Sequence, residues 1–277
     1  MIRSAAAALR SSVEPPPQPR LPGADESHLW HASVLRTDAQ VARLERTLSR
    51  DERERARRYA APCDRRRFVV ARGLLRALLG RYLERDPASV AFAYGRTGKP
   101  ELVGGQNEAD LRFSLAHSGG VVLYAFARGR AVGVDVEELR PLDEFDALSR
   151  TVFSLREREE LQAQPPSRRL RAFFDGWVRK EAVLKGSGDG LGAELPATEV
   201  SLARSDGPLP RVVHGDDRAR TTWTLRNVPM GPRYAAAVAV AGPQGGTSQG
   251  RVAARRSTPS RTPGVRVVRL RAPEEFA

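Results

Sequence analysis

The order in which helical and strand-like patterns follow one another is the strongest constraint on the fold of this chain. Apolar residues spaced three and four apart predict helices, whereas short β-branched and aromatic runs between turn residues predict strands. In the first half these patterns predict, in order, a strand at 28–35, helices at 38–48, 49–60 and 65–83, and strands at 90–94, 111–116, 121–127 and 131–137.

The second half repeats this order. Its patterns predict helices at 154–162 and 168–185, then strands at 198–202, 219–227 and 234–240. Helices and mostly antiparallel strands in separate runs indicate an α+β fold of two loosely similar halves, not a doubly wound sheet. We expect the break near residues 138–143. This gives an N-terminal lobe at 26–140 and a C-terminal lobe at 141–241.

Both ends of the chain differ in composition from the lobes. Prolines dominate 11–23, and a Gly, Gln and Ser stretch leads into an arginine-rich tail, so we expect disorder in 1–25 and in 242–277. Residues 251–277 carry seven arginines against two glutamates, which is five of the thirteen net positive charges. We expect this tail to be passive in function.

Composition excludes several classes of protein. No window reaches the ~18 uninterrupted apolar residues of a membrane span. The start of the chain is too short and too soon interrupted by Arg10 for a signal peptide. Cys63 is the only cysteine, which excludes an intramolecular disulfide and a cysteine-rich zinc site. We therefore expect a cytoplasmic protein without a membrane partner.

Lysine is rare in this basic chain. Lys99, Lys180 and Lys185 are the only lysines among 46 basic residues. A general drift from lysine to arginine explains this composition. A position that keeps lysine is then a candidate functional position, at which the compact charge of an ammonium is required and the planar guanidinium of arginine does not serve.

An acidic pair lies on a predicted strand. In the segment 132–138, valines alternate with Gly133, Asp135 and Glu137, so both carboxylates share one face of the strand. Adjacent carboxylates repel unless a cation lies between them, and their oxygens suit Mg²⁺ or Mn²⁺. The alternative is an exposed strand end whose acids pair with nearby arginines.

A third carboxylate lies on the helix predicted at 168–185. Trp177, Glu181 and Lys185 follow one another at intervals of four, so they share one helix face. Glu181 and Lys185 alone could be a stabilising helix pair worth about 0.2–0.5 kcal/mol. Together with the acidic strand, they indicate a site for a divalent metal and a phosphate-rich substrate.

Four segments carry a resemblance to a known family. They are GKP (98–100), FSLAHSGG (113–120), VGVDVEE (132–138) and WVRKEAVLKGSGDGL (177–191). In this order and spacing the chain resembles the Sfp-type 4′-phosphopantetheinyl transferases over most of residues 30–240. The resemblance implies two α+β lobes related by a pseudo-twofold axis, with the active site in the cleft between them. It also implies transfer of 4′-phosphopantetheine from coenzyme A to a serine of a carrier protein, with release of adenosine 3′,5′-bisphosphate.

The resemblance also implies roles for individual residues. The expected metal ligands are Asp135, Glu137 and Glu181, and the expected coenzyme A contacts are Arg55, Arg67, Lys99, Pro100, His117, Lys180 and Lys185. Lys99 and Pro100 would lie on the adenine side and His117 at the 3′-phosphate. Arg66 and Arg72 are rivals of Arg55 and Arg67, because no motif fixes the register there. Ala116 replaces the serine that precedes this histidine in many relatives, so a hydroxyl contact would be lost.

The mechanism and the partners are implied in the same way. Lys185 would stabilise the leaving bisphosphate. The proton of the acceptor serine would go to Glu181 or to a water held by the metal, and the sequence leaves this choice open. We expect a monomer that acts on acyl, peptidyl or aryl carrier proteins. A nucleotide-sugar glycosyltransferase and a basic nucleic-acid-binding protein remain alternatives. The first lacks a nucleotide-binding half here, and the second would need more aromatic residues than this chain has.

Overall fold

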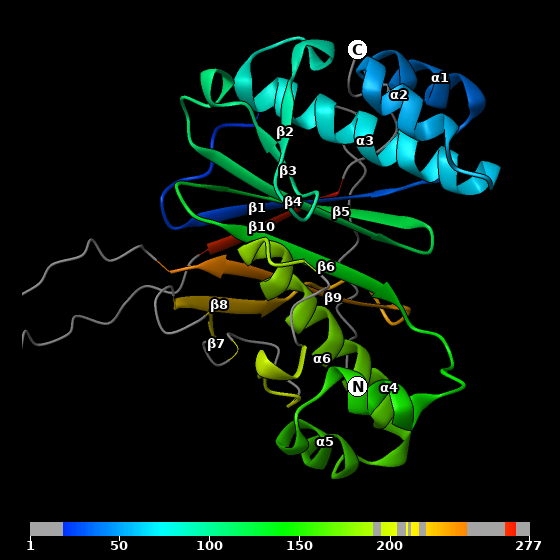
Figure 1. The fold of residues 1–277 in the computed structure, drawn as a ribbon, viewed down its shortest axis with the longest axis vertical. Helices are drawn as coiled ribbons and strands as arrows, with labels where there is room; N and C mark the ends of the chain where they lie inside the picture. Colours follow the sequence, from blue (N-terminus) through cyan, green and yellow to red (C-terminus); the bar gives the residue numbers. More distant parts are fainter. Residues whose placement is uncertain are drawn as a thin grey trace, which may run out of the picture.

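The computed structural model describes residues 19–190, 195–203, 209, 212–215, 220–242 and 264–269. In the first half the elements are β1 (Glu26–Ser33), α1 (Asp38–Arg46), α2 (Arg50–Arg57), α3 (Pro62–Leu83), β2 (Phe92–Tyr94), β3 (Pro100–Leu102), β4 (Leu111–Ser118) and β5 (Val121–Arg128). They are followed by β6 (Val132–Glu138), α4 (Phe145–Val152), α5 (Leu155–Gln162), α6 (Pro166–Ser187), β7 (Val212–His214), β8 (Thr221–Asn227), β9 (Tyr234–Ala241) and β10 (Gly264–Arg269) (Figure 1).

The first lobe is a sheet covered by a long helix. Its strands run in the order β10-β1-β5-β4, and β2 and β3 form a separate antiparallel hairpin. The 22-residue helix α3 packs its apolar residues on this sheet, where Leu74 and Leu78 join Phe126 in one buried cluster. The hydroxyl of Tyr124 also donates to the carbonyl of Ala71 across this interface.

The second lobe repeats this plan. Its sheet has the order β6-β9-β8-β7, and the 22-residue helix α6 packs on it through residues such as Phe173 and Val183. Each lobe begins with a strand, two short helices and one long helix. The strand orders β1-β5-β4 and β6-β9-β8 then correspond to each other. This confirms the α+β fold of two similar lobes.

The two sheets pack against each other through a third apolar cluster. Leu123 and Ala125 of β5 meet Val134 and Val136 of β6, and all four are buried. The alternation along β6 is therefore as expected, since its valines face the other sheet. Gly133 and Asp135 are left to face α6.

The boundary between the lobes lies earlier than the sequence predicted. Antiparallel pairing of β6 with β9 places Val132–Glu138 in the second sheet, so the lobes divide between Arg128 and Val132, not at residue 140. The strand expected at 198–202 is also wrong. The backbone N–H groups of Val200 and Leu202 donate to the side chains of Glu157 and Glu160, so they do not form a ladder.

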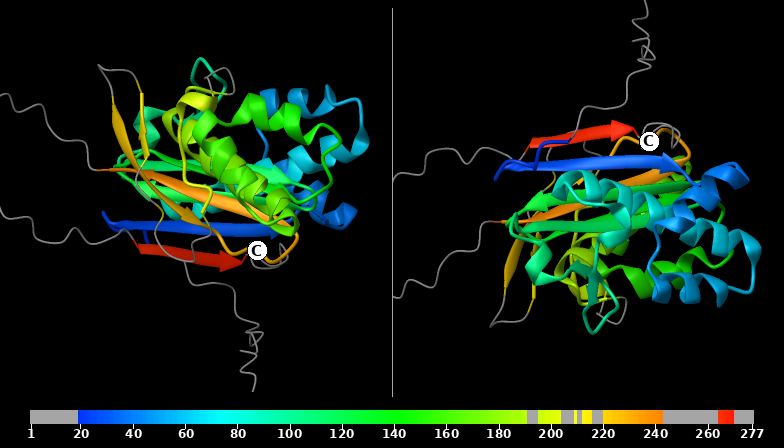
Figure 2. Two further views of the ribbon diagram at one scale, coloured as in Figure 1. Left: turned by 90° about the horizontal axis from the view of Figure 1, so that it is seen from below. Right: turned by 90° about the horizontal axis from the view of Figure 1, so that it is seen from above.

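The tail contains a strand that we did not expect. β10 pairs in parallel with β1 at the edge of the first sheet, and both views of Figure 2 show the two strands side by side. The prediction of disorder across 242–277 is therefore wrong for 264–269. Residues 1–18, 243–263 and 270–277 lie outside the described residues. Within the described helices, none has both the length and the apolar character needed to cross a bilayer.

Candidate functional site

Two glycines bring helix α6 close to strand β6. A Cβ atom on Gly133 would lie 1.9 Å from the carbonyl oxygen of Ala182 and 2.4 Å from the backbone nitrogen of Gly186. One on Gly186 would lie 2.5 Å from the ring of Trp223 of β8 and 3.2 Å from the backbone nitrogen of Gly133. Only hydrogen fits at either position. The backbones of strand and helix therefore meet, and the side chain of Asp135 lies directly beside α6.

This contact creates a buried cluster of charged groups. The Nζ of Lys185 donates to Oδ1 of Asp135 at 2.5 Å, and Asp135 is only 3% exposed. Burial raises the pKa of Asp135 to about 7, although the ammonium of Lys185 acts in the opposite direction. Burial also raises the pKa of Glu181, with Lys185 again opposing the shift. Both carboxylates are thus held where a proton and a cation compete for them.

The oxygens left over in this cluster can accept a cation. Oδ2 of Asp135 and Oε1 of Glu181 are buried and have no hydrogen-bond partner. The third expected ligand, Glu137, lies two residues along the same face, and its charge raises the pKa of both other carboxyls. Among the described residues, no set of three acidic, histidine or cysteine side chains is already arranged around a metal position. The donor set fits a hard divalent ion, and its binding stays a prediction.

A cationic cavity of about 240 Å³ adjoins this cluster. It is lined by Arg55, Tyr59, Phe68, Ala71, Arg72, Leu115, Ala116, His117 and Lys185. Burial lowers the pKa of His117, and the charges of Arg67 and Lys185 lower it further. The cavity therefore favours a ligand that brings negative charge.

Arg72 is the cation best prepared to bind an anion in this cavity. Its guanidinium lies 5.8 Å from the ring of Phe68 and 5.1 Å from the ring of Phe92, and its NH1 is buried without a hydrogen-bond partner. Its Nε lies 3.5 Å from Oε1 of Glu52. The sequence offered Arg72 only as a rival position. Its spacing of four from Phe68 on α3 was the signal that could have favoured it.

The other candidate arginines differ in placement. Arg55 lines the cavity. Arg67 is near enough to affect His117, but it pairs with Asp64 at 2.8 Å. Arg66 bonds Asp38 and the carbonyl of Arg36, so its partners lie outside the cavity.

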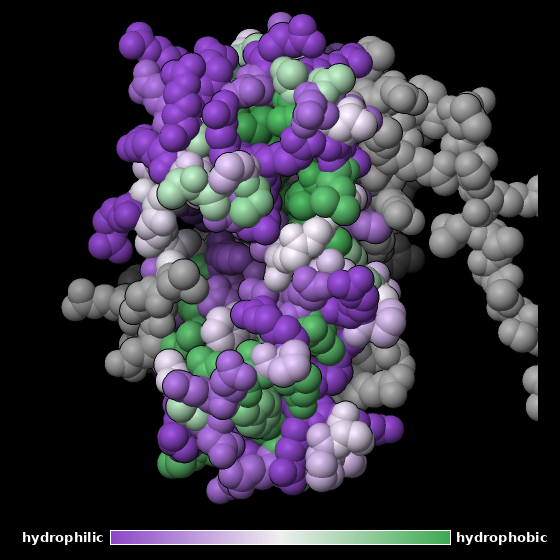
Figure 3. All heavy atoms as spheres, turned by 90° about the vertical axis from the view of Figure 1, so that its right-hand side faces the viewer, coloured by the Kyte–Doolittle hydropathy of each residue, from purple (hydrophilic) through white to green (hydrophobic). Residues whose placement is uncertain are grey.

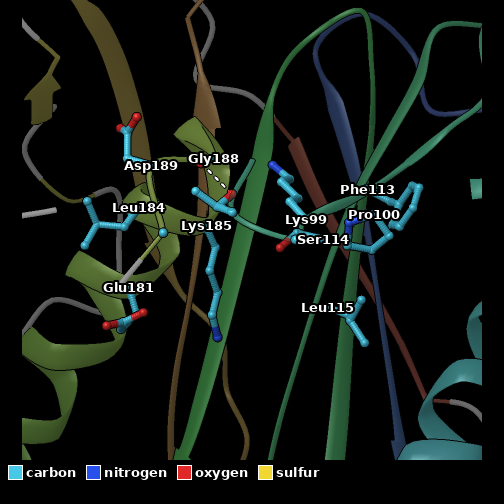
Figure 4. A pocket seen from close by; sticks show the side chains of 13 residues that line it. Lys99, Pro100, Phe113, Ser114, Leu115, Glu181, Leu184, Lys185, Gly188 and Asp189 are labelled. Carbon is cyan, nitrogen blue, oxygen red and sulfur yellow. Dashed lines mark hydrogen bonds between the residues drawn. The ribbon is translucent and has the colours of Figure 1, made fainter. Parts of the chain in front are cut away.

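A second pocket, of about 530 Å³, lies on the other side of Lys185. Figure 4 shows Glu181, Leu184 and Lys185 projecting from α6, with Phe113 and Leu115 of β4 across from them. Lys185 and Leu115 line both this pocket and the cationic cavity, so the two spaces lie next to each other. Figure 3 shows a hollow with a hydrophilic floor between the upper and lower parts of the molecule.

Lys99 and Pro100 line the rim of this pocket. The Nζ of Lys99 donates to the carbonyl of Gly186 at 2.9 Å, and the hydroxyl of Thr97 donates to that of Gly188 at 2.8 Å. Burial lowers the pKa of Lys99 to about 8. Lys99 thus joins the first lobe to the last turn of α6. Its compact ammonium can donate to a carbonyl at the helix C-terminus, where the helix dipole favours positive charge.

Lys180 is placed differently from the expected phosphate contact. Its side chain is fully buried, with Nζ 2.6 Å from Oε2 of Glu157 and bonded to two carbonyls of the following segment. The first lobe has the same arrangement, since Arg76 binds Glu52 at 2.6 Å and donates to carbonyls after α3. Arg76 and Lys180 both lie fourteen residues after the first residue of their long helix. This geometry favours a structural role for Lys180, and the phosphate role expected from the sequence stays a prediction.

Comparisons with known proteins cover both lobes. A family model described as the 4′-phosphopantetheinyl transferase superfamily matches residues 131–239, and one for the N-terminal part of a 4′-phosphopantetheinyl transferase matches 31–128. The chain is similar to the 4′-phosphopantetheinyl transferase HetI of Nostoc, at 38% identity over 79% of this chain and 89% of that protein. It is also similar to AcpT of Salmonella typhi, at 41% identity over 41% of this chain and 56% of that protein. Its identity to Sfp of Bacillus subtilis is 28%, over 56% of this chain and 66% of that protein.

Proposed function

The chain belongs to the 4′-phosphopantetheinyl transferase superfamily, and we propose that the cleft between its lobes is the site at which phosphopantetheine leaves coenzyme A for a carrier-protein serine. One observation carries this proposal. Lys185, which donates to Asp135, lines both the cationic cavity and the pocket that Glu181, Phe113 and Leu184 line. Coenzyme A has the matching order of parts, because its diphosphate lies between its phosphorylated nucleoside and its uncharged pantetheine arm. This order would place the arm, and not the adenine expected from the sequence, beside Lys99 and Pro100.

The charged parts of coenzyme A fit the cations of the cleft. The 3′-phosphate would enter the cavity formed by Arg55, Arg72 and His117. Lys185 would contact the diphosphate, because it lines both spaces. Charge-assisted hydrogen bonds of this kind are the stronger ones in proteins.

The carboxylates of the cleft would hold a divalent metal. Asp135, Glu137 and Glu181 would hold Mg²⁺ or Mn²⁺, because two of them have buried oxygens without partners. When bound, the ion neutralises charge on the diphosphate oxygens.

The side chains of this protein would perform the remaining steps. Glu181 would take the proton of the acceptor serine, because burial raises the pKa of this carboxyl and makes its ionised form a better base. The serine oxygen then bonds to the phosphorus that carries pantetheine, and the bond from that phosphorus to the bridging oxygen breaks. Lys185 would stabilise the negative charge on adenosine 3′,5′-bisphosphate as it leaves.

The partners proposed for this enzyme follow from the site. Holo-carrier-protein synthesis on acyl, peptidyl or aryl carrier domains, in the cytoplasm, is the activity we propose. Both lobes of one chain line the cleft, so a monomer would suffice.

The test is a mass shift on a carrier protein. The protein is incubated with apo-carrier domains of the three classes, coenzyme A and Mg²⁺, and each carrier is weighed by mass spectrometry. We expect a gain of one phosphopantetheine with the wild type and the E159A variant, because Glu159 is exposed on α5. We expect no gain with D135A or E181A. Unchanged turnover in either variant would contradict the assignment.

A thermal shift assay separates this function from nucleic-acid binding. Coenzyme A should raise the melting temperature, whereas duplex DNA should not at physiological salt. The reverse result would favour the nucleic-acid alternative.

A further inference from the structure

The two sheets meet at a seam between β4 and β6. Each strand is the edge of its own sheet, so neither has a backbone ladder to the other in the described residues. Two serines of β4 bridge the seam instead. Oγ of Ser114 accepts from the N–H of Val134 at 3.2 Å, and Oγ of Ser118 accepts from the N–H of Glu138 at 3.0 Å.

Ser118 makes a second hydrogen bond, to a side chain of β6, whereas among the described residues Ser114 bonds only to the backbone of that strand. The hydroxyl of Ser118 donates to Oε2 of Glu137 at 2.7 Å. A hydroxyl has one proton, and here the bond accepted from Glu138 leaves this proton for the carboxylate. Ser118 thus holds the Glu137 carboxylate through a hydroxyl that is itself bonded to the backbone N–H of Glu138.

Glu137 has a competing partner on its exposed side. NH1 of Arg140 lies 3.6 Å from the same Oε2, and the Arg140 side chain is 61% exposed. Without the hydroxyl of Ser118, this arginine would be the remaining partner in contact with Oε2. The carboxylate would then turn toward solvent and away from Asp135.

We propose that Ser118 is a positioning residue that holds Glu137 in the orientation needed to bind a divalent metal with Asp135 and Glu181. This inference rests on the proposed function and adds a residue from the opposite lobe to the metal site. Groups that orient a ligand carboxylate are worth about 10-fold to 100-fold in metal affinity. Ser118 acts through Glu137 and needs no contact with substrate.

The test measures Mn²⁺ binding by the free protein, with electron paramagnetic resonance of unbound Mn²⁺ as the readout. We expect S118A to weaken Mn²⁺ binding by about 10-fold or more, and S118T, which keeps the hydroxyl, to bind within a few-fold of the wild type. S114A is the matched control, because it removes the other bridge of the seam without touching Glu137. We expect it to leave Mn²⁺ affinity unchanged.

A double variant distinguishes a misplaced Glu137 from a general weakening of the contact between β4 and β6 in S118A. Removing Arg140 in S118A/R140A should recover part of the lost Mn²⁺ affinity, because the competing partner is gone. Circular dichroism and melting curves check that S118A and S114A remain folded.

Three results would overturn the inference. They are wild-type affinity in S118A, an equal loss in S114A and S118A, and a wild type that transfers phosphopantetheine but binds no Mn²⁺. The last of these would leave the proposed transfer standing. A wild type that binds Mn²⁺ with the expected dependence on Ser118 but modifies no carrier would support the inference and overturn the transfer.

Discussion

Its place in the cationic cavity makes Arg72, which the sequence offered as a rival position, our preferred ligand of the 3′-phosphate. Arg72 lines the cationic cavity and its NH1 is buried without a hydrogen-bond partner, while Glu52 and three aromatic rings lie beside the guanidinium. A hydrogen bond to a charged group contributes about 1.5–3 kcal/mol. We therefore expect R72M to raise the KM for coenzyme A about 10-fold or more.

The same variant should lose its preference for the 3′-phosphate. With 3′-dephospho-coenzyme A as donor, the KM values of R72M and the wild type should differ little. R66M is the control, because Arg66 bonds outside the cavity. If R72M raised the KM equally for both donors, Arg72 would not be the ligand of the 3′-phosphate.

Replacing Lys180 tests whether this lysine binds phosphate or stabilises the fold. Breaking a buried ion pair by removing one partner costs about 3–5 kcal/mol. We expect K180M to lower the free energy of unfolding by an amount of this order, because Glu157 is then left buried and unpaired. Urea unfolding measures this loss. A K180M protein of normal stability that no longer binds coenzyme A would restore the phosphate role.

Asp135 should make metal binding depend on pH. Its pKa is raised to about 7 in the fold, and a metal must displace the proton. We expect Mn²⁺ affinity to rise as the pH increases through about 7 and to level off above it. Because the folded protein holds this proton more tightly than the unfolded chain, Asp135 also makes metal-free stability fall as the pH rises from about 4 to 7. Affinity that stays constant between about pH 6 and pH 8 would contradict this expectation.

At the scale of elements, the site depends on how closely α6 approaches β6. A methyl group on Gly133 would collide with the backbone carbonyl of Ala182, so the helix would have to move. Overpacking of this kind costs about 1–3 kcal/mol. We expect G133A to be less stable in urea and to lose most transfer activity, since Glu181 and Lys185 move with the helix. G105A is the control, because nothing lies within 4 Å of its Cβ.

The elements also show what the sequence could and could not predict. Alternation along 132–138 and the spacing of four on α6 are local patterns, and they identified Asp135, Glu137, Glu181 and Lys185. The strand expected at 198–202 failed because Glu157 supplies the acceptor for Val200, which only the tertiary fold brings near. The pairing of β10 with β1 joins distant segments, so no local pattern specifies it.

At the scale of the whole molecule, the site lies where two similar lobes differ. The residue after Arg76 on α3 is Ala77, whereas the residue after Lys180 on α6 is Glu181. The buried structural cation is thus repeated in both lobes, but the acidic group beside it occurs only in the second. The first lobe instead contributes Arg72 and His117. The composite site that we propose in the cleft would therefore use anion-binding groups from one lobe and carboxylates from the other.

The position of β10 predicts what the tail does. Within the first sheet, β10 lies at the edge opposite β4, and β4 is the strand that lines the cleft. Deleting 243–277 should therefore expose the edge of β1, lower the melting temperature and favour aggregation. The KM values for coenzyme A and for carrier protein should stay within a few-fold of the full chain.

A shorter deletion separates the strand from the rest of the tail. Removing only 270–277 keeps β10, so both stability and kinetics should match those of the full chain. Melting curves and initial rates at two salt concentrations check both deletions. The salt series matters because a basic tail that attracted an acidic carrier would act by screened electrostatics. A carrier KM that rose many-fold at low salt in the longer deletion, with coenzyme A binding intact, would show that the tail recruits the carrier.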